Sequence, residues 1–443
     1  MYKKEFQTIF DYAEGKVDEI EILLSANDSF SVKINEQNIE SFDYADSNGI
    51  SVRVIKDDKM GYSYAEKFDE KTLQMIVDEA LENAKFTEDN EIAYMSNHDD
   101  VDNKPKLYSK ELDKVDINDK ITFAKNLEKI SKETDKRVFN VPYAALGNGK
   151  TFVKISNNKG LNKEETQNYM YAYVASLCAQ DDDKRMGMEF VIGRDFSKFN
   201  AAKLAKKSVQ KSTELLGGIE IESSPYPVVF NNEMMATMLS TFSGIFNAKA
   251  VHEGRSLLID KIGTKIANDK VTIIDDALHP DGFSSRSFDS EGFPSKRNIL
   301  IENGKLKTYL HNTQTARKDN ISSTGNASRG YKGTLGISPS NFYLKKGQNS
   351  EKELFKQHDK LVEIVSLQGM HSGANPISGD FSLSAEGFLY ENGKRSTSLK
   401  QFTVSGNIID LLKNIELIAD NFRFNMSSIG APSVLVSKLD LSG

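Results

Sequence analysis

Apolar and polar residues alternate in short runs along the first section of the chain, and these runs predict strands followed by an amphipathic helix. Apolar positions between Leu73 and Ala84 are spaced by threes and fours, the period of a helix with one buried face. Before that helix, Asn48-Gly49 predicts a turn between two strands. The four strands expected here cover residues 20–25, 30–34, 50–55 and 61–64.

A second section repeats the mixture of strands and helices, which is consistent with an internal duplication. Residues 88–109 are acidic and polar and predict an exposed connection between the two sections. One amphipathic helix is expected around Ile121 to Ile130, and another from about Phe199 to Leu216. Between these helices, strands are predicted over residues 152–155 and 169–174.

The pattern changes after Pro225-Tyr-Pro227, where an apolar helix over 234–246 precedes short strands crowded by Gly, Ser and Asn. Glu302-Asn-Gly304 and Glu391-Asn-Gly393 each follow an apolar run, which is typical of a hairpin turn. Repeated hairpins predict antiparallel β structure. The strands expected here cover 228–230, 271–274, 299–301, 307–310, 387–390 and 433–436.

These elements predict an α+β protein. We expect an N-terminal mixed α/β domain, followed by a strand-rich, barrel-like antiparallel C-terminal domain. The expected division is an N-terminal strand-helix domain over residues 1–110, a central α/β section over 111–222 and a C-terminal β-rich domain over 223–443.

Composition narrows the function classes. The 443 residues carry a net charge of -7, which disfavours a protein whose main partner is nucleic acid. Cys178 is the only cysteine, so an internal disulfide and a cysteine-rich zinc site are both excluded. No signal peptide and no membrane-spanning segment are visible, and together with the single cysteine this favours the cytoplasm.

His252-Glu253 is the first candidate for chemistry, because zinc peptidases pair His and Glu on a helix. That chemistry needs a second His one turn further on, so that both imidazoles reach one metal. Ser256 and Leu257 occupy those positions, and the other histidines are scattered singly. We therefore interpret His252-Glu253 as a solvated polar pair and keep a metal site as the minority hypothesis.

Other motifs favour structural roles. Gly325, Gly330, Gly333 and Gly336 lack the context of a phosphate loop and suit loops between short strands. The stretch Ser322 to Arg329 could offer backbone groups to a peptide by strand addition. Cys178 lies in an apolar run, which predicts a buried, inert thiol. Asp380 and the turn Asp289 to Gly292 are expected to cap turns rather than to catalyse.

Several segments, in order, resemble the TldD/PmbA family. They span nearly the whole chain, which makes the resemblance far more specific than any one motif. The segments are Asn48-Gly-Ile-Ser-Val-Arg-Val-Ile, Gly61-Tyr-Ser-Tyr, Phe288-Asp-Ser-Glu-Gly-Phe, Arg297 to Leu310, Thr315-Ala-Arg-Lys, Ser323-Thr-Gly-Asn-Ala-Ser, Ser378-Gly-Asp-Phe-Ser, Gly387-Phe-Leu-Tyr-Glu-Asn-Gly-Lys and Thr403-Val-Ser-Gly-Asn-Ile.

That resemblance implies one of two paralogous kinds of subunit. The TldD kind carries His-Glu-x-x-x-His on a helix after the central boundary and a cysteine near the C-terminus, and is a zinc peptidase. The PmbA kind, also called TldE, lacks these ligands and pairs with TldD. Here the matching helix, Met234 to Phe246, contains no His, and Gly430 to Val436 offers no cysteine, so the chain resembles the PmbA kind.

The resemblance implies a subunit with no catalytic, cofactor-binding or metal residue of its own. A TldD-type partner would supply zinc, and together the two subunits would enclose a cavity where unfolded peptides are cut, for peptide maturation or antitoxin proteolysis. Alone, the chain would form a homodimer. One alternative is a self-sufficient peptidase that uses His252 and Glu253 with a third ligand such as His371 or Asp380. Another is a non-proteolytic regulator of DNA gyrase.

Overall fold

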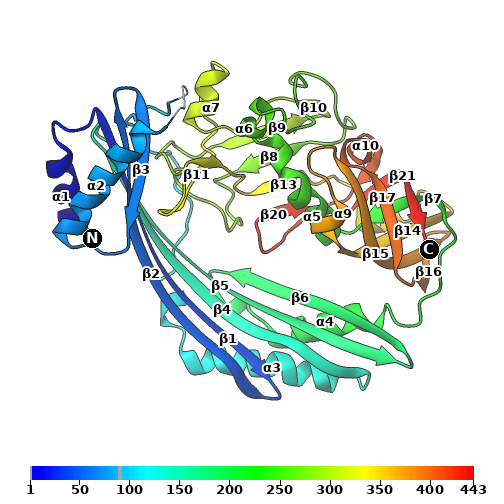
Figure 1. The fold of residues 1–443 in the computed structure, drawn as a ribbon. Helices are drawn as coiled ribbons and strands as arrows, with labels where there is room; N and C mark the ends of the chain where they lie inside the picture. The colour runs from blue at the N-terminus through cyan, green and yellow to red at the C-terminus, as the bar shows by residue number, and fades with distance from the viewer. Residues whose placement is uncertain (1, 88–91) are drawn as a thin grey trace.

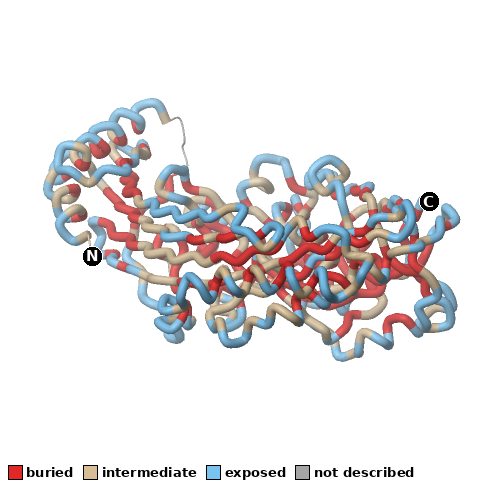
Figure 2. Tube along the Cα trace, turned by 90° about the horizontal axis from the view of Figure 1, so that it is seen from below, coloured by how far each residue is buried: buried red, intermediate tan, exposed pale blue. Residues whose placement is uncertain are grey.

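The computed structural model describes residues 2–87 and 92–443. It combines a long, curved antiparallel sheet with a C-terminal domain that lies over the concave side of that sheet (Figure 1). Buried residues follow the strands of both parts, whereas the outer faces of the helices are exposed (Figure 2). No helix within the described ranges is both long enough and apolar enough to cross a membrane.

The long sheet has six strands in the order β3-β2-β1-β4-β5-β6, and every neighbouring pair is antiparallel. Helices α1 and α2 cover one end of it, and α3 and α4 cover the other (Figure 1). The strands are β1 Glu19–Asn35, β2 Asn38–Lys56, β3 Lys59–Ala65, β4 Val138–Asn157, β5 Asn162–Gln180 and β6 Asp183–Gly193. The helices are α1 Lys3–Ala13, α2 Glu70–Lys85, α3 Ile117–Thr134 and α4 Ala201–Thr213.

Local signals place the long helices. The side chain of Asp69 accepts a hydrogen bond from the Thr72 N–H at the start of α2, and Asp116 caps α3 in the same way through Asn118. The apolar stripe from Leu73 to Ala84 is buried against the sheet, as its period predicts. The expected helices in this half of the chain are therefore confirmed, and the structure contains one helix, α1, that was not predicted.

The turn expected at Asn48-Gly49 is wrong, because both residues lie inside β2 and pair with β1. The chain reverses instead at Glu36 and Gln37, which adopt positive φ angles of 50° and 61°. Gly49 is needed for packing: a Cβ there would come within 2.2 Å of the Tyr331 ring. In addition, the two strands expected over 20–25 and 30–34 form one continuous strand, β1, so the section has three strands instead of four.

The connection expected over 88–109 begins with residues 88–91, which lie outside the described residues. Beyond them the exposed connection is partly wrong, since Ala93 and Leu107 are buried. Asn168 holds the connection against β5 by accepting a hydrogen bond of 2.9 Å from the Ser109 N–H. The division at residue 110 remains a prediction; β1 and β4, which fall on either side of it, belong to one sheet.

The C-terminal domain contains a closed barrel of five strands, because β14 pairs with both β7 and β15. The barrel-like α+β fold expected from sequence is therefore confirmed, although the β7–β14 pair is parallel. The barrel strands are β7 Ser224–Phe230, β14 Lys360–Gln368, β15 Asp380–Glu391, β17 Phe402–Asn407 and β21 Val434–Ser442. Two further strands extend this sheet: β16 Lys394–Ser398 and β18 Ile415–Ile418.

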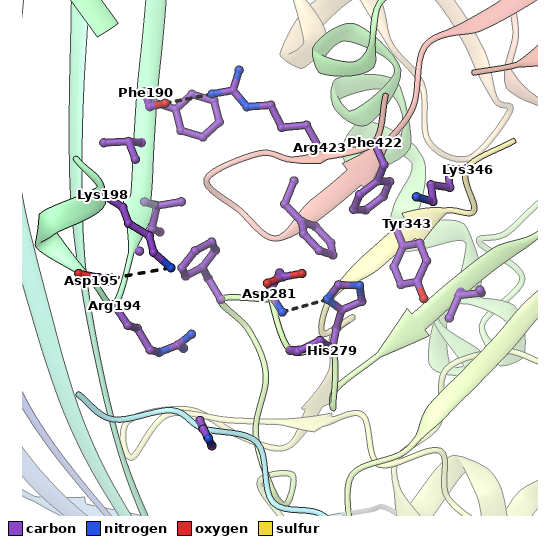
Figure 3. Close-up of a pocket in the computed structure, with 18 of the residues that line it drawn as sticks. Phe190, Arg194, Asp195, Lys198, His279, Asp281, Tyr343, Lys346, Phe422 and Arg423 are labelled. Carbon is purple, nitrogen blue, oxygen red and sulfur yellow. Dashed lines mark hydrogen bonds and ion pairs between the residues drawn. The ribbon is translucent and has the colours of Figure 1, made fainter. Parts of the chain in front are cut away.

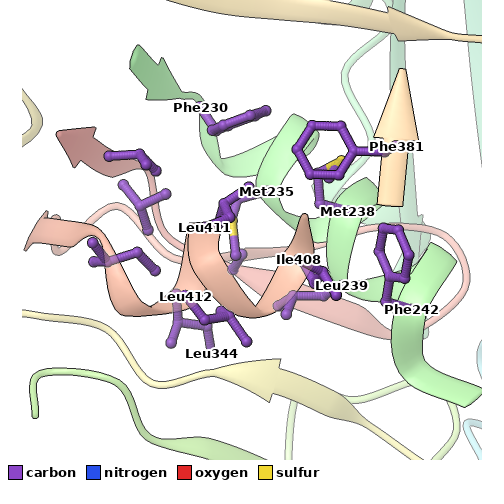
Figure 4. Close-up of a cluster of buried hydrophobic side chains, with 14 of the residues drawn as sticks. Phe230, Met235, Met238, Leu239, Phe242, Leu344, Phe381, Ile408, Leu411 and Leu412 are labelled. Atoms are coloured by element: carbon purple, nitrogen blue, oxygen red, sulfur yellow. The ribbon is translucent and has the colours of Figure 1, made fainter. Parts of the chain in front are cut away.

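A second sheet of six short strands lies beside the barrel, in the order β10-β9-β8-β13-β20-β19. Helix α5, Asn232–Phe242, contacts strands of both and carries much of the core between them (Figure 4). The strands are β8 Ile273–Asp276, β9 Arg297–Glu302, β10 Lys305–Leu306, β13 Phe342–Leu344, β19 Arg423–Phe424 and β20 Ile429–Ala431. The strand expected over 307–310 is therefore wrong, because regular pairing ends at Leu306.

Both predicted hairpin turns of this domain are confirmed. Asn303 and Gly304 have φ angles of 48° and 79°, and Asn392 and Gly393 have φ angles of 51° and 75°. The remaining short elements are α6 Ala248–His252, α7 Thr313–Lys318, α8 Glu351–Leu354, α9 Met370–Gly373, α10 Ile408–Lys413, β11 Ala327–Ser328, β12 Gly336–Ile337 and the 3-10 turns Leu112–Lys114, Phe196–Lys198 and Ser243–Phe246.

Candidate functional site

A pocket of about 980 Å³ lies between the end of β6 and the loops of the C-terminal domain (Figure 3). One wall is residues 190–195 with Lys198, and the opposite wall combines loop residues 279–281 and 283 with residues around β13 and β19. The pocket therefore forms only where the long sheet and the C-terminal domain meet, which is why no local motif signals it.

Aromatic rings line the C-terminal wall of the pocket. The Phe422 and Phe424 rings meet edge to face with centroids 4.9 Å apart, and Tyr343 contacts Phe422 at 5.5 Å. The His279 ring packs on Phe424 at 5.0 Å. Gly430 makes room for this cluster, because a Cβ there would lie 2.5 Å from the Phe422 ring. The wall is thus a preformed apolar surface.

Cations outnumber carboxylates around the pocket. The lining basic residues are Lys106, Arg194, Lys198, Arg297, Lys345, Lys346 and Arg423, and the lining acidic residues are Asp195, Asp281 and Asp420. Arg194 donates from Nε to the Leu107 carbonyl at 3.0 Å and lies over the Phe283 ring. Burial lowers the pKa of the Arg194 guanidinium. Within the described ranges, neither Arg194 nor Lys345 nor Lys346 forms an ion pair with a carboxylate.

Arg423 joins the two walls. Its Nη2 lies 2.5 Å from Glu189 of β6, and its Nη1 lies 2.6 Å from Glu233 of α5. Lys211 of α4 binds the same two carboxylates at 3.0 Å and 2.8 Å. Burial of Glu189 would raise the pKa of its carboxyl, but Lys211 and Arg423 outweigh that effect and lower it. This ionised network fixes β6 against the C-terminal domain.

The free edge of β6 is partly covered. β6 is the last strand of its sheet, so alternate residues direct their backbone N–H and C=O groups outward. The Met188 carbonyl accepts a hydrogen bond from Lys211 Nζ, and the Phe190 carbonyl accepts one from Arg423 Nη2 at 3.0 Å. By the same alternation Ile192 directs its backbone groups outward, into the pocket that it lines.

Helix α5 contacts β19 and β20 next to this pocket. Its inward side chains Met235, Met238, Leu239 and Phe242 are buried in the core that Figure 4 shows. Ile429, Gly430 and Ala431 of β20 are buried as well. Across residues 2–87 and 92–443, no three His, Cys, Asp or Glu side chains form a group that could hold a metal ion.

His252 and Glu253 lie at the end of α6, away from the pocket lining. His252 Nε2 is 2.8 Å from Asp319 Oδ1, while Glu253 pairs with Arg255, which lowers the pKa of the Glu253 carboxyl. Among the proposed third ligands, Asp380 accepts a hydrogen bond of 2.9 Å from Asn407, and His371 lies in α9. The structure thus gives His252 and Asp380 separate partners.

A second histidine shares the carboxylate of Asp319. His311 Nε2 lies 3.8 Å from Asp319 Oδ2, and the His311 side chain is buried. Burial lowers the pKa of His311 to about 4, so its imidazole is neutral at physiological pH. Sequence reasoning missed this pairing, because His252, His311 and Asp319 have no characteristic spacing.

The remaining sequence candidates have structural surroundings. Cys178 is buried and accepts a hydrogen bond of 2.9 Å from the Ser212 hydroxyl, and burial raises the pKa of its thiol. Asp289 Oδ1 accepts from the N–H groups of Glu291 and Phe293, so it caps its turn as expected. Within the stretch Ser322 to Arg329, Ala327–Ser328 already pairs with β12.

Three family models match the chain. They are described as PmbA/TldA metallopeptidase domain 1 over residues 20–84, the central domain over 110–216 and the C-terminal domain over 223–443.

Two relatives and one solved structure extend these matches over nearly the whole chain. An uncharacterised protein of Methanocaldococcus jannaschii is 30% identical over 97% of this chain and 98% of its own length. A metalloprotease PmbA homologue of Haemophilus influenzae is 25% identical over 96% of this chain and 92% of its own. The crystal structure of a Thermotoga maritima protein, described as a candidate modulator of a DNA gyrase, superposes with a TM-score of 0.92 at 30% identity and covers 100% of both chains.

Proposed function

The chain belongs to the PmbA/TldD metallopeptidase family, and from this premise we propose that it is the supporting, PmbA-type subunit of a peptidase that cuts unfolded peptides. A TldD-type partner would carry zinc, activate water and supply the general base. This chain would supply part of the cavity wall and part of the peptide-contact surface. We propose the cytoplasm as its compartment, since a reducing environment suits its one buried thiol.

One observation carries the proposal. The helix that matches the metal-binding helix of the TldD kind is α5, and it contacts β20, which lies in the C-terminal segment where that kind has its cysteine. In this chain the buried face of α5 is occupied by Met235, Met238, Leu239 and Phe242. Thioether and hydrocarbon side chains do not supply the imidazole and thiolate ligands that zinc prefers. The contact supports a structural role for this face.

The pocket beside this contact supports the second half of the proposal. An aromatic wall, several cations and a strand edge are suited to holding an extended peptide. A pocket of about 980 Å³ is large enough to contain several peptide side chains. Glu189 and Glu233 do not line the pocket themselves but bind its lining residue Arg423, and Lys211 binds both of them. Those carboxylates are suited to fixing the pocket wall.

Co-expression with a TldD-type partner tests the assignment. We expect the two chains to elute as one complex, with near-stoichiometric zinc in the complex and far less in this chain alone, where light scattering should find a homodimer. Near-stoichiometric zinc in the isolated chain, lost in a His252→Ala variant, would overturn the proposal. That result would favour a self-sufficient peptidase that uses His252 and Glu253.

A further inference from the structure

We propose that the pocket between β6 and the C-terminal domain selects acidic peptide segments, in which a carboxylate neighbours an apolar or aromatic side chain. This inference rests on the proposed function, because it names the class of peptide that the supporting subunit holds. Three features of the pocket carry it: an open strand edge, cations without carboxylate partners and a preformed aromatic wall.

The strand edge supplies the backbone contact. The outward carbonyls of Met188 and Phe190 are bound by Lys211 and Arg423, which blocks strand addition over that part of β6. Ile192 is the next outward residue of the strand, and it faces the pocket. A peptide in extended conformation can therefore exchange two hydrogen bonds with Ile192 and continue past the end of β6.

The charges set the preference for acidic peptides. Arg194 follows Ile192 by two residues, so its guanidinium lies where a side chain of the bound peptide would pass, and Figure 3 shows it directed into the pocket. Lys345 and Lys346 approach from the opposite wall. Their loop is fixed in place: the Lys345 N–H donates to the Thr272 carbonyl, and Gly347 packs so closely on Ile418 that a Cβ would lie 2.0 Å from the Ile418 oxygen.

The lining cations of the pocket differ in whether they form an ion pair with a carboxylate of the chain. Arg423, Lys198 and Arg297 face carboxylates of the chain at 2.5 Å, 3.7 Å and 3.7 Å. Lys106, Arg194, Lys345 and Lys346 form no ion pair in the part of the chain that the structure describes. Arg194 instead donates to the Leu107 carbonyl, and the nearby charge of Glu165 offsets only part of the effect of its burial. Arg194 is partly buried and therefore less screened by solvent, so it attracts a carboxylate more strongly than the exposed Lys345 and Lys346 do. A peptide carboxylate would complete their interactions.

The aromatic wall adds an apolar requirement. Tyr343, Phe422 and Phe424 present ring surfaces on the wall opposite β6. Because successive side chains of an extended peptide point to opposite sides, an acidic residue and an apolar residue in alternation fit the two walls. Single-stranded nucleic acid also stacks on aromatic rings, but the chain's net charge of -7 disfavours a polyanion over a short peptide.

Fluorescence anisotropy on the isolated full chain tests the proposal without zinc, partner or cleavage. The probe is a labelled, unstructured peptide in which Glu alternates with Val and Phe, and its control has Gln at every Glu. We expect the Glu peptide to bind about tenfold more tightly, and the difference to shrink as salt is added. Equal affinity for the two peptides would overturn the proposal. A matched oligonucleotide that binds more tightly than the Glu peptide would overturn it as well.

Variants locate the selectivity. Arg194→Gln and the exposed Lys346→Gln should each reduce the preference for Glu over Gln severalfold, whereas Lys438→Gln, on the exposed face of β21, should leave it unchanged. When the peptide N–H groups are methylated one at a time, methylation of the residue that faces Ile192 should weaken binding, and methylation of the residues next to it should not. If both pocket variants keep the full preference for the Glu peptide over the Gln peptide, the assignment of that preference to this pocket is overturned. Because no cleavage is measured, failure of the supporting-subunit assignment would leave this result intact.

Discussion

Arg329 donates a hydrogen bond of 2.6 Å from Nη2 to Oε1 of Glu21, a residue 308 positions earlier in the chain. The two side chains are 0% and 1% exposed, and they join the C-terminal domain to the long sheet. Arg53 of β2 binds the same carboxylate at 3.1 Å and approaches Glu291 at 3.7 Å. A buried ionic network therefore fixes the two parts of the chain relative to each other, and with them both walls of the pocket.

Removing one member of this network should destabilise the chain strongly. Arg329→Met leaves Glu21 buried with one partner fewer, and breaking a buried ion pair from one side costs about 3–5 kcal/mol. Urea denaturation should show that loss in the free energy of unfolding. Lys56→Met is the control, since Lys56 also pairs with a carboxylate, that of Asp18 at 3.1 Å, but both side chains of that pair are exposed to solvent. A similar loss in both variants would contradict the account.

The stability of the barrel should depend on pH through Glu363. Burial, only partly offset by Arg395, raises the pKa of Glu363 to about 7 in the folded chain. The folded state thus holds this proton more tightly than the unfolded state, whose carboxyl titrates near 4.5. The contribution of this bound proton to the free energy of unfolding is complete below pH 4.5 and is lost as the pH rises to about 7.

Glu363→Gln isolates this contribution, because Gln keeps an oxygen that can accept from the Tyr390 hydroxyl. Between pH 4.5 and 7 the free energy of unfolding of the native chain should fall relative to that of the variant, by up to about 3 kcal/mol. Urea denaturation of both proteins at a series of pH values measures this difference in the free energy of unfolding. Parallel pH profiles for the two proteins would show that the Glu363 carboxyl titrates normally.

The network around Arg423 should hold β6 in place. Arg423→Met removes the ion pairs to Glu189 and Glu233 and frees the Phe190 carbonyl, at a cost of about 2 kcal/mol for the lost charged hydrogen bonds. Hydrogen exchange in β6 should then be faster in the variant than in the native chain, whereas exchange in β1, which lies inside the sheet, should be the same in both. Unchanged protection of β6 would mean that the network does not fix the pocket wall.

The buried face of α5 should behave as core. Leu239→Ala should lower the free energy of unfolding by about 2–5 kcal/mol, because Leu239 is 3% exposed and a cavity would remain. Ser240→Ala, one position further on and only partly buried, should change it by less than about 0.5 kcal/mol. Thermal or urea unfolding of both variants gives the comparison. Tolerance of the Leu239 change would argue that this face is free to carry another function.

Sequence reasoning succeeded where structure is set locally. The helix from Leu73 to Ala84 and the turns at Asn303-Gly304 and Asn392-Gly393 follow from spacing and from backbone angles that few residues adopt. Asn48-Gly49 carries the same turn signal, yet it lies within a strand, because pairing with β1 and the ring of Tyr331 decide its conformation. Strand length in the long sheet depends on such distant partners.

The candidate site could be predicted only in outline. His252 and Glu253 attracted attention as a familiar pair, but nothing near them in sequence indicates Asp319, which binds His252. Arg194 and Lys346 come from sections of the chain that only the folded arrangement brings to one pocket. Their lack of counterions is likewise a property of three-dimensional position, so a count of charges could not find it.

The most direct test of the supporting-subunit account is cleavage of an unfolded peptide by this chain alone, by a TldD-type partner alone and by the two together. The account predicts no cleavage by this chain alone and full activity only on mixing, with the His252→Ala variant of this chain as active in the mixture as the native one. Cleavage by this chain alone that His252→Ala abolishes would contradict it.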